Sequence, residues 1–140
     1  MIKIITNKLK KSIILIGNFD GLHLGHQALV SQGTSLAEQH QLKSVALTFK
    51  PFPRVYFEPQ KPHICLQRLS EKYLALRSMD IEYLLCLRFN EALARLSPEE
   101  FVCSILVDGL QAKFVVVGDD FRFAKNRMGN VETLRALGLK

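Results

Sequence analysis

The chain has 140 residues, of which 48% are hydrophobic and 23% are charged, and its formal net charge at pH 7 is +6. This length suits one domain, residues 1–140, that removes about two-thirds of its unfolded surface from water. The composition excludes a disordered or collagen-like chain. No apolar run approaches the roughly 18 residues of a membrane helix, and Met1 to Ile5 lacks the long apolar region of a signal peptide. We therefore expect a cytoplasmic protein without a membrane partner.

The positive charge is spread along the sequence rather than gathered in blocks of five or six. The aromatic and basic residues do not alternate as they do in single-strand binders. A positive balance also steers small anionic substrates, so we expect no nucleic-acid partner. The three cysteines have unrelated spacings and predict reduced, mostly buried thiols instead of a disulfide framework.

The strongest local pattern is an apolar run followed by a glycine-rich bend and a helix. Ile13 to Ile16 predicts a strand buried on both faces. Gly17, Gly21 and Gly25 let the backbone turn and approach a ligand closely, and a helix of about four turns follows. Free N–H groups and the helix dipole converge at such a helix start, which favours an anion site. A tight structural connection is the alternative for the bend alone.

Two histidines, His23 and His26, lie at the start of this predicted helix and face the same way. Imidazoles donate hydrogen bonds to phosphate oxygens, more strongly when they are protonated. A zinc site would need further ligands, and the other histidines and the cysteines are scattered without ligand spacing. The pair therefore favours phosphate contact over both zinc and a plain connection.

Strands and helices alternate along the chain. A short edge strand is expected at Met1 to Ile5, and the prolines Pro51 and Pro53 predict an extended loop without regular structure after the second core strand. The other expected elements are strands at Ser44 to Phe49, Tyr83 to Leu87 and Phe114 to Val117, and helices at Leu66 to Met79, Asn90 to Leu96, Ser97 to Gly109 and around Val131 to Gly138.

This alternation predicts an α/β fold with a parallel sheet and helices on both faces. Ligands of such sheets bind beyond the carboxyl ends of the strands, where the strand order reverses. Two strands, Ile13–Ile16 and Phe114–Val117, run into turns rich in Gly, Asn and Asp. If these strands are neighbours, both turns face one cleft.

Several motifs carry a resemblance to a known family. Gly17-Asn18-Phe19-Asp20-Gly21-x-His23-x-Gly25-His26 resembles the His-x-Gly-His signature of adenylyl- and cytidylyltransferases, in the form found in the FMN adenylyltransferase module of bacterial riboflavin kinase/FAD synthetase. Val116 to Gly129 closely resembles the second signature of that module. Further similar motifs are Thr48-Phe49-x-Pro51-x-Pro53, Leu69-Ser70-x-Lys72 and Leu96-Ser97-Pro98-Glu99-Glu100-Phe101.

The resemblance implies a Rossmann-like nucleotidyltransferase fold and the transfer of AMP from ATP to FMN, giving FAD and pyrophosphate, with Mg²⁺ as cofactor. It implies that His23 and His26 are catalytic and that Asp120 is the Mg²⁺ ligand. The implied nucleotide contacts are Gly17, Asn18, Phe19, Asp20, Gly21, Gly25 and Arg127, and the implied flavin contacts are Phe49, Phe52, Asp120 and Phe123. Core packing is the alternative for the phenylalanines, a turn cap for Asp120 and a solvated side chain for Arg127.

The chain departs from the family pattern at three places. Phe52 stands where the family usually has His, and Ala124 replaces a glycine, which disfavours a positive φ. The chain ends at Lys140, before a further strand, a Ser-Ser-Thr-x-Ile-Arg motif and the riboflavin kinase domain of the family. We therefore expect a fold without its last strand, no kinase domain, and self-association through the exposed edge of the 114–117 strand.

Two other functions stay open. One is the transfer of AMP or CMP to another phosphate or to pantetheine, which the second signature disfavours. The other is a non-catalytic remnant that binds nucleotide or flavin, which the early end of the chain favours. Formation of FAD would exclude both.

Overall fold

The computed structural model describes residues 11–138, so the strand expected at Met1 to Ile5 lies outside the described residues. Four strands form one parallel sheet in the order β3-β2-β1-β4. Their bounds are β1 (Ser12–Ile16), β2 (Lys43–Lys50), β3 (Tyr83–Arg88) and β4 (Ala112–Val116). The predicted α/β fold with a parallel sheet is confirmed.

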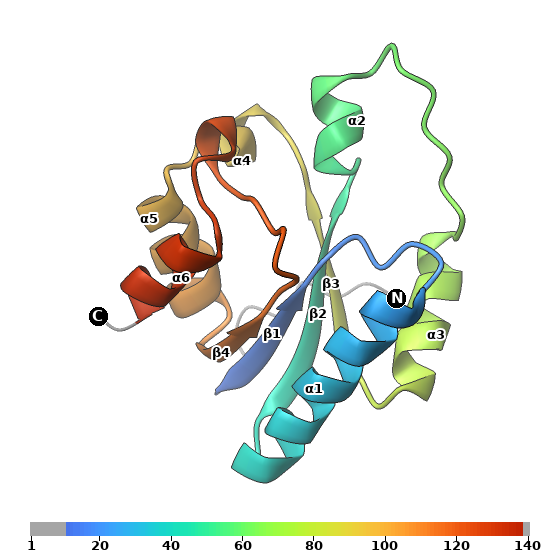
Figure 1. Ribbon diagram of the computed structural model, residues 1–140, viewed down its shortest axis with the longest axis vertical. Helices are drawn as coiled ribbons and strands as arrows, with labels where there is room; N and C mark the ends of the chain where they lie inside the picture. The colour runs from blue at the N-terminus through green and yellow to red at the C-terminus, as the bar shows by residue number, and fades with distance from the viewer. Residues whose placement is uncertain (1–10, 139–140) are drawn as a thin grey trace.

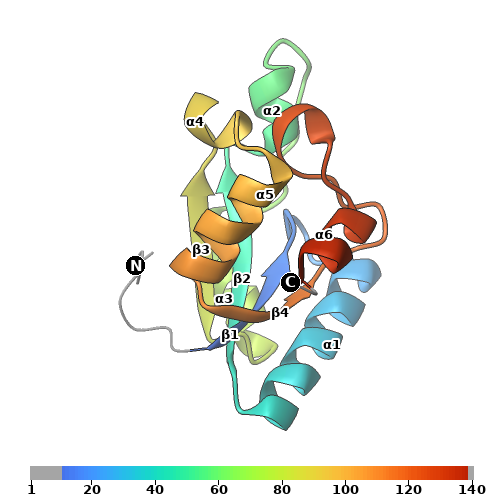
Figure 2. The same ribbon diagram turned by 90° about the vertical axis from the view of Figure 1, so that its left-hand side faces the viewer.

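Helices cover both faces of this sheet, as Figures 1 and 2 show: α1 and α3 lie on one face, and α5 and α6 on the other. The helical elements are α1 (Leu24–His40), α2 (Pro53–Phe57), α3 (Leu69–Ser78), α4 (Glu91–Ala94), α5 (Pro98–Glu100), η1 (Phe101–Gly109), η2 (Lys125–Arg127) and α6 (Val131–Gly138). Each helix in residues 11–138 is too short or too polar to cross a lipid bilayer.

The central strand β1 supplies side chains to two cores, because successive residues of a strand point to opposite faces. Ile13 and Leu15 pack with α1 and α3, whereas Ile14 and Ile16 pack with η1 on the other face. All four side chains are at most 2% exposed. The continuous apolar run was therefore a correct signal of a strand buried on both faces.

Strand order reverses at β1, which has β2 on one side and β4 on the other. The predicted neighbourhood of the two strands that run into glycine-rich turns is confirmed. Both turns therefore leave the sheet at its carboxyl end, where ligands bind in folds of this class. Strand β4 lies at an edge of the described sheet. Self-association through that edge stays a prediction, and sedimentation velocity would test it.

Two predicted boundaries were wrong. The loop expected over Lys50 to Arg54 becomes α2 at Pro53, because a proline at the first helical position gives up an N–H that has no helical partner anyway. Helix α3 begins at Leu69 instead of Leu66, because the N–H groups of Leu66 and Gln67 donate to a side chain of another loop.

The helix predicted to begin at Ser97 is confirmed by a reciprocal cap. The Glu100 amide donates to the Ser97 hydroxyl at 3.1 Å, and the Ser97 amide donates to the Glu100 carboxylate at 2.8 Å. Beyond α5 the backbone widens into the π-helical η1, in which the Leu110 amide reaches the Ile105 carbonyl at 3.0 Å. The apolar pattern alone does not distinguish this from an α-helix.

The cysteines Cys65, Cys86 and Cys103 are free thiols. Cys65 and Cys103 are exposed, so the expectation of mostly buried thiols was wrong. Cys65 lies in the loop before α3, where the local backbone faces another loop instead of the core.

Gly33 allows α1 to pack closely on β1. A methyl group there would come within 2.5 Å of Leu15 Cδ2, and Leu15 is fully buried. We expect Gly33→Ala to lower the free energy of unfolding. Overpacking of a core costs about 1–3 kcal/mol, and the short contact here favours the upper end of that range. That cost exceeds the roughly 1 kcal/mol by which Ala stabilises a helix relative to Gly. Urea denaturation measures the change. Gly138→Ala, where no atom lies within 4 Å, is the control and should not destabilise; equal losses in both variants would contradict the close packing.

Candidate active site

The loop from β1 to α1 leaves the sheet at its carboxyl end and is anchored by an aromatic ring. The Gly17 amide donates to the Leu47 carbonyl at 3.1 Å and extends the pairing of β1 with β2. Phe19 is fully buried, and its ring lies 3.3 Å from the position that a Cβ of Gly17 would take. The ring of Phe19 is therefore a core anchor beneath the loop, and the predicted nucleotide contact of this residue stays a prediction.

His23 caps the first turn of α1. Its Nδ1 accepts hydrogen bonds from the amides of Gly25 at 3.1 Å and His26 at 3.4 Å. Because Nδ1 is the acceptor, the ring proton of neutral His23 resides on Nε2. The side chain is exposed, so this Nε2–H is a donor directed outward at the positive end of a helix. A Cβ at Gly25 would lie only 3.0 Å from the His23 ring, so a larger residue there would require the ring to shift.

His26 stacks on His23, with ring centroids 3.7 Å apart and planes 23° from parallel. Partial burial, then the nearby His23 and Lys72, lower the pKa of His26 below its ordinary value, while Asp20 opposes them. His26 Nδ1 is buried and has no hydrogen-bond partner among the described residues. The two histidines therefore lie side by side at the start of α1, and the lowered pKa of His26 disfavours its protonated form.

Asp20 joins this loop to the segment before α3. Its carboxylate accepts hydrogen bonds from the amides of Leu66 at 2.9 Å and Gln67 at 3.0 Å. The Gly21 amide donates to Gln67 Oε1 at 3.2 Å, and Gly21 has φ +80°. The structure thus gives Asp20 and Gly21 partners within the chain, whereas their contact with a nucleotide stays a prediction.

Lys72 is a site residue that sequence reasoning did not single out, although it belongs to the Leu69-Ser70-x-Lys72 motif. Its side chain is buried, and Nζ donates to the Asn18 carbonyl at 2.6 Å. Nζ also lies 4.7 Å from the centroid of the Phe52 ring. Burial lowers the pKa of Lys72, and the Asp20 carboxylate opposes that shift.

An aromatic cluster lies where β2 and β3 end. Phe89 is 5.2 Å from Tyr56, 5.8 Å from Phe57 and 5.8 Å from Phe49, between ring centroids. Phe49 is only 8% exposed and belongs to the core, whereas Phe57 is 53% exposed, and the flavin contact of Phe49 stays a prediction. The exposed ring of Phe57 lies on α2. The sequence predicted a loop without regular structure at the start of this helix, and that prediction was wrong. Phe52 is half-buried beside Lys72 and remains a candidate contact.

Phe123 packs in the core, and its flavin contact stays a prediction. Its side chain is 7% exposed and lies 5.3 Å from the ring of Phe101. The backbones of Phe123 and Gly129 exchange two hydrogen bonds of 3.1 and 2.9 Å. A Cβ at Gly129 would lie 2.5 Å from the Phe123 ring, so glycine and phenylalanine form one packing unit. Phe121, stacked 5.5 Å away, is the more exposed ring of the alternating pair.

Asp120 and Arg127 are exposed on the loop that follows β4. No hydrogen bond or ion pair joins Arg127 to the histidines within residues 11–138, so its nucleotide contact stays a prediction. No cluster of three His, Cys, Asp or Glu side chains suited to a metal ion occurs in that range. A single carboxylate does fit Mg²⁺, which commonly binds one or two protein carboxylates together with substrate phosphates.

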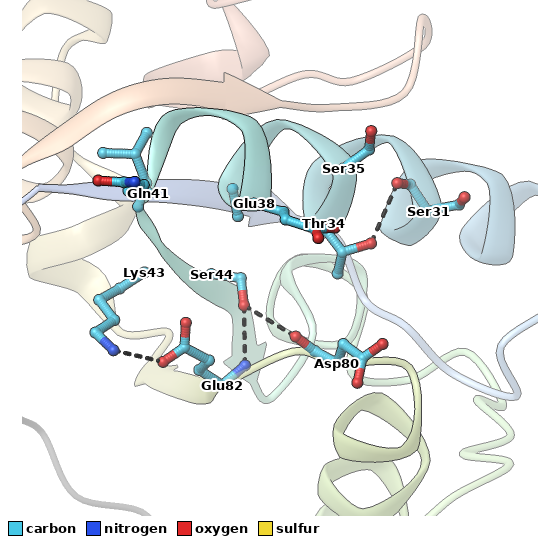
Figure 3. A pocket seen from close by; sticks show the side chains of 11 residues that line it. Ser31, Thr34, Ser35, Glu38, Gln41, Lys43, Ser44, Asp80 and Glu82 are labelled. Carbon is cyan, nitrogen blue, oxygen red and sulfur yellow. Dashed lines mark hydrogen bonds and ion pairs between the residues drawn. The ribbon is translucent and has the colours of Figure 1, made fainter.

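A separate hollow of about 750 Å³ lies at the other end of the sheet (Figure 3). It is bordered by the end of α1, the start of β2 and the residues before β3. Several of its polar groups are paired: Ser44 Oγ donates to the Asp80 carbonyl at 3.2 Å, and Lys43 lies 2.9 Å from Glu82. The hollow therefore shares none of the histidine, glycine or aromatic groups of the site.

We expect acid to destabilise the folded protein through His26. The folded state lowers the pKa of this group, so the unfolded state binds more protons once the pH falls below the ordinary value of 6.5. The contribution of neutral His26 to the free energy of unfolding is fully present above that pH. It is lost as the pH falls toward the lowered pKa of the folded state. Urea denaturation between about pH 5 and 8 should show a shallower pH dependence in His26→Gln than in wild type; identical curves would contradict the shift.

Ala124 adopts φ 68° and ψ −175°, a region that is nearly restricted to glycine. Such strain costs about 1–3 kcal/mol, so we expect Ala124→Gly to raise the free energy of unfolding. Ala136→Gly, on an exposed face of α6, is the matched control and should lower it by up to about 1 kcal/mol. Chemical denaturation measures both. A destabilised Ala124→Gly would contradict the strained backbone.

Comparison with known proteins places this site in a family. A family model described as FAD synthetase matches residues 5–140. The chain is 36% identical over 129 residues to the bifunctional riboflavin kinase/FMN adenylyltransferase of Buchnera aphidicola subsp. Acyrthosiphon pisum, and 37% identical over 128 residues to that of Escherichia coli K12. These alignments cover 92% and 91% of this chain and 41% of each relative, so the chain spans about two-fifths of the length of these curated relatives.

The fold is also similar to a crystal structure of a macrolide-efflux protein from Streptococcus pneumoniae. The TM-score is 0.79 at 25% identity, over 94% of this chain and 44% of that one. This likeness supports the arrangement of strands and helices described above. The family assignment rests on the family model, which matches nearly the whole sequence. The chain belongs to the FAD synthetase family.

Proposed function

We propose that this chain transfers the adenylyl group of ATP to FMN, giving FAD and pyrophosphate. The observation that carries the proposal is the start of α1, where His23 Nδ1 caps the helix and leaves Nε2–H as an outward donor beside His26. Membership of the FAD synthetase family supports the choice of substrates. Helix start, backbone amides and imidazoles together suit a triphosphate.

The chemistry needs no nucleophile from the protein. A phosphate oxygen of FMN attacks the α-phosphorus of ATP and forms the new P–O bond. The bond from that phosphorus to the oxygen bridging to the β-phosphate breaks, and its electron pair leaves with pyrophosphate. His23 and His26 would donate hydrogen bonds to the phosphate oxygens as their charge redistributes, so positioning and electrostatic stabilisation supply the catalysis.

The remaining contacts follow from the two loops beside the histidines. The backbone of Gly17, Asn18 and Gly25 would approach the nucleotide, and Arg127 would reach its phosphates. The exposed ring of Phe57 and the neighbouring Phe52 are the aromatic surfaces suited to an isoalloxazine ring. Asp120 would hold Mg²⁺, which neutralises phosphate charge when bound.

Two substitutions at one position separate helix capping from phosphate contact. Asn is a good N-cap residue, so His23→Asn should keep the cap but lose the Nε2 donor. We expect FAD formation to fall about a hundredfold or more, with little change in thermal stability. His23→Ala should show the same loss and a further destabilisation of about 1 kcal/mol.

The rate is measured by chromatography of FAD from ATP and FMN, with His40→Asn at the far end of α1 as the control. Full activity in a folded His23→Asn protein would remove the histidine from the reaction. Tight binding of ATP and FMN by the wild-type chain without any FAD would instead identify a non-catalytic binding protein.

The attacking group in this proposal is a phosphate, so FMN should be used and riboflavin should not. Incubation of the chain with ATP and each flavin should give FAD from FMN only, and no FMN from riboflavin. Separation of the three flavins by chromatography with fluorescence detection measures both reactions. Production of FMN from riboflavin would show a kinase activity that the proposed single adenylyltransferase domain does not explain.

A further inference from the structure

Lys72 is the only charged side chain classed as buried within residues 11–138, with 3% of the residue exposed. It lies in the first turns of α3, where the helix dipole disfavours a cation. No carboxylate forms an ion pair with it among the described residues, so burial is not offset by a direct counter-charge. Such an unfavourable placement calls for a compensating role.

The contacts of Lys72 connect three segments that lie far apart in the sequence. Nζ donates to the Asn18 carbonyl at 2.6 Å, and the Thr48 hydroxyl donates to the same oxygen at 3.4 Å. The ammonium also lies 4.7 Å from the Phe52 ring centroid, within the range of a cation–π interaction. Lys72 thereby joins α3 to the β1–α1 loop and to the residue before α2, and Thr48 at the end of β2 shares the Asn18 carbonyl with it.

The charge of Lys72 also reaches the histidine pair. Asp20, Cys65 and Cys86 face the ammonium and favour its charged form, whereas burial lowers the pKa of Lys72. In turn, the positive charge of Lys72 is one of the causes that lower the pKa of His26. A neutral side chain at position 72 would remove that contribution.

We propose that Lys72 is a positioning residue: through the Asn18 carbonyl and the Phe52 ring it fixes the loop that presents His23 and His26 relative to the flavin side of the site. This inference rests on the proposed transfer of AMP to FMN. The Asn18 carbonyl accepts its shortest side-chain hydrogen bond from this ammonium. Without that bond the loop between β1 and His23 loses a hydrogen bond to α3. Misplacement of a catalytic group by about 1 Å costs on the order of a hundredfold in rate.

The test compares Lys72→Met, Lys72→Gln and Lys72→Arg with Lys61→Met as the control. Lys61 is exposed and pairs with Glu58 2.6 Å away, outside the site. The measurements are FAD formation, nucleotide affinity, urea denaturation and the titration of the His26 ring by NMR. Lys72→Met should lower kcat about ten- to a hundredfold and raise the pKa of His26. Lys72→Arg should keep that pKa near its wild-type value and recover part of kcat, and Lys61→Met should change neither.

A folded Lys72→Met protein with wild-type kcat and an unchanged pKa of His26 would overturn the proposal. If Lys72→Met does not fold, Lys72→Gln answers the same question, because it is neutral but retains a donor. A loss of kcat in the neutral variants with no change at His26 and no partial recovery in Lys72→Arg would show a merely structural role.

The proposed function fails separately, if wild type makes no FAD. In that event the His26 titration and the ATP affinity of the variants still decide whether Lys72 positions the loop. Unchanged values in folded neutral variants would then overturn the inference, and shifted values would support it.

Discussion

The site depends on one small constraint, the capping of α1 by the imidazole of His23. The amides of Gly25 and His26 both donate to Nδ1, which fixes the tautomer, the ring orientation and the direction of the remaining N–H donor. The same geometry stacks His26 on His23. A helix start that was capped by serine would satisfy the backbone equally well, but it would leave no second donor for a phosphate. The proposed function thus joins stability of the helix and phosphate recognition in one side chain.

Two side chains of opposite charge, Asp20 and Lys72, stabilise the loop before this cap. Each forms hydrogen bonds with the backbone of another segment. The Asp20 carboxylate accepts from the amides before α3, and the Lys72 ammonium from α3 donates back to the Asn18 carbonyl. The charges therefore stabilise loop conformations through hydrogen bonds instead of forming a direct ion pair. Such bonds between a charged group and the backbone are stronger than neutral ones and more directional than a surface ion pair.

Local signals in the sequence were sufficient for much of the fold. The apolar run Ile13–Ile16 and the Ser97 cap are properties of adjacent residues, and both were predicted correctly. The burial of Phe49 and Phe123 in the core could not be read from the sequence, because local pattern does not reveal which neighbours cover each ring. The role of Lys72 depends on a contact 54 residues away along the chain, which no local pattern encodes.

The start of α1 concentrates positive and proton-binding groups. Two imidazoles stack, Lys72 is one of the causes that lower the pKa of His26, and one nitrogen of that ring is buried without a partner in the described part of the chain. In the proposed function, a polyanion at the start of α1 would favour protonated imidazole and would offset the charge of the buried ammonium, because nearby opposite charges stabilise each other. These groups would act most strongly where negative charge accumulates during the transfer.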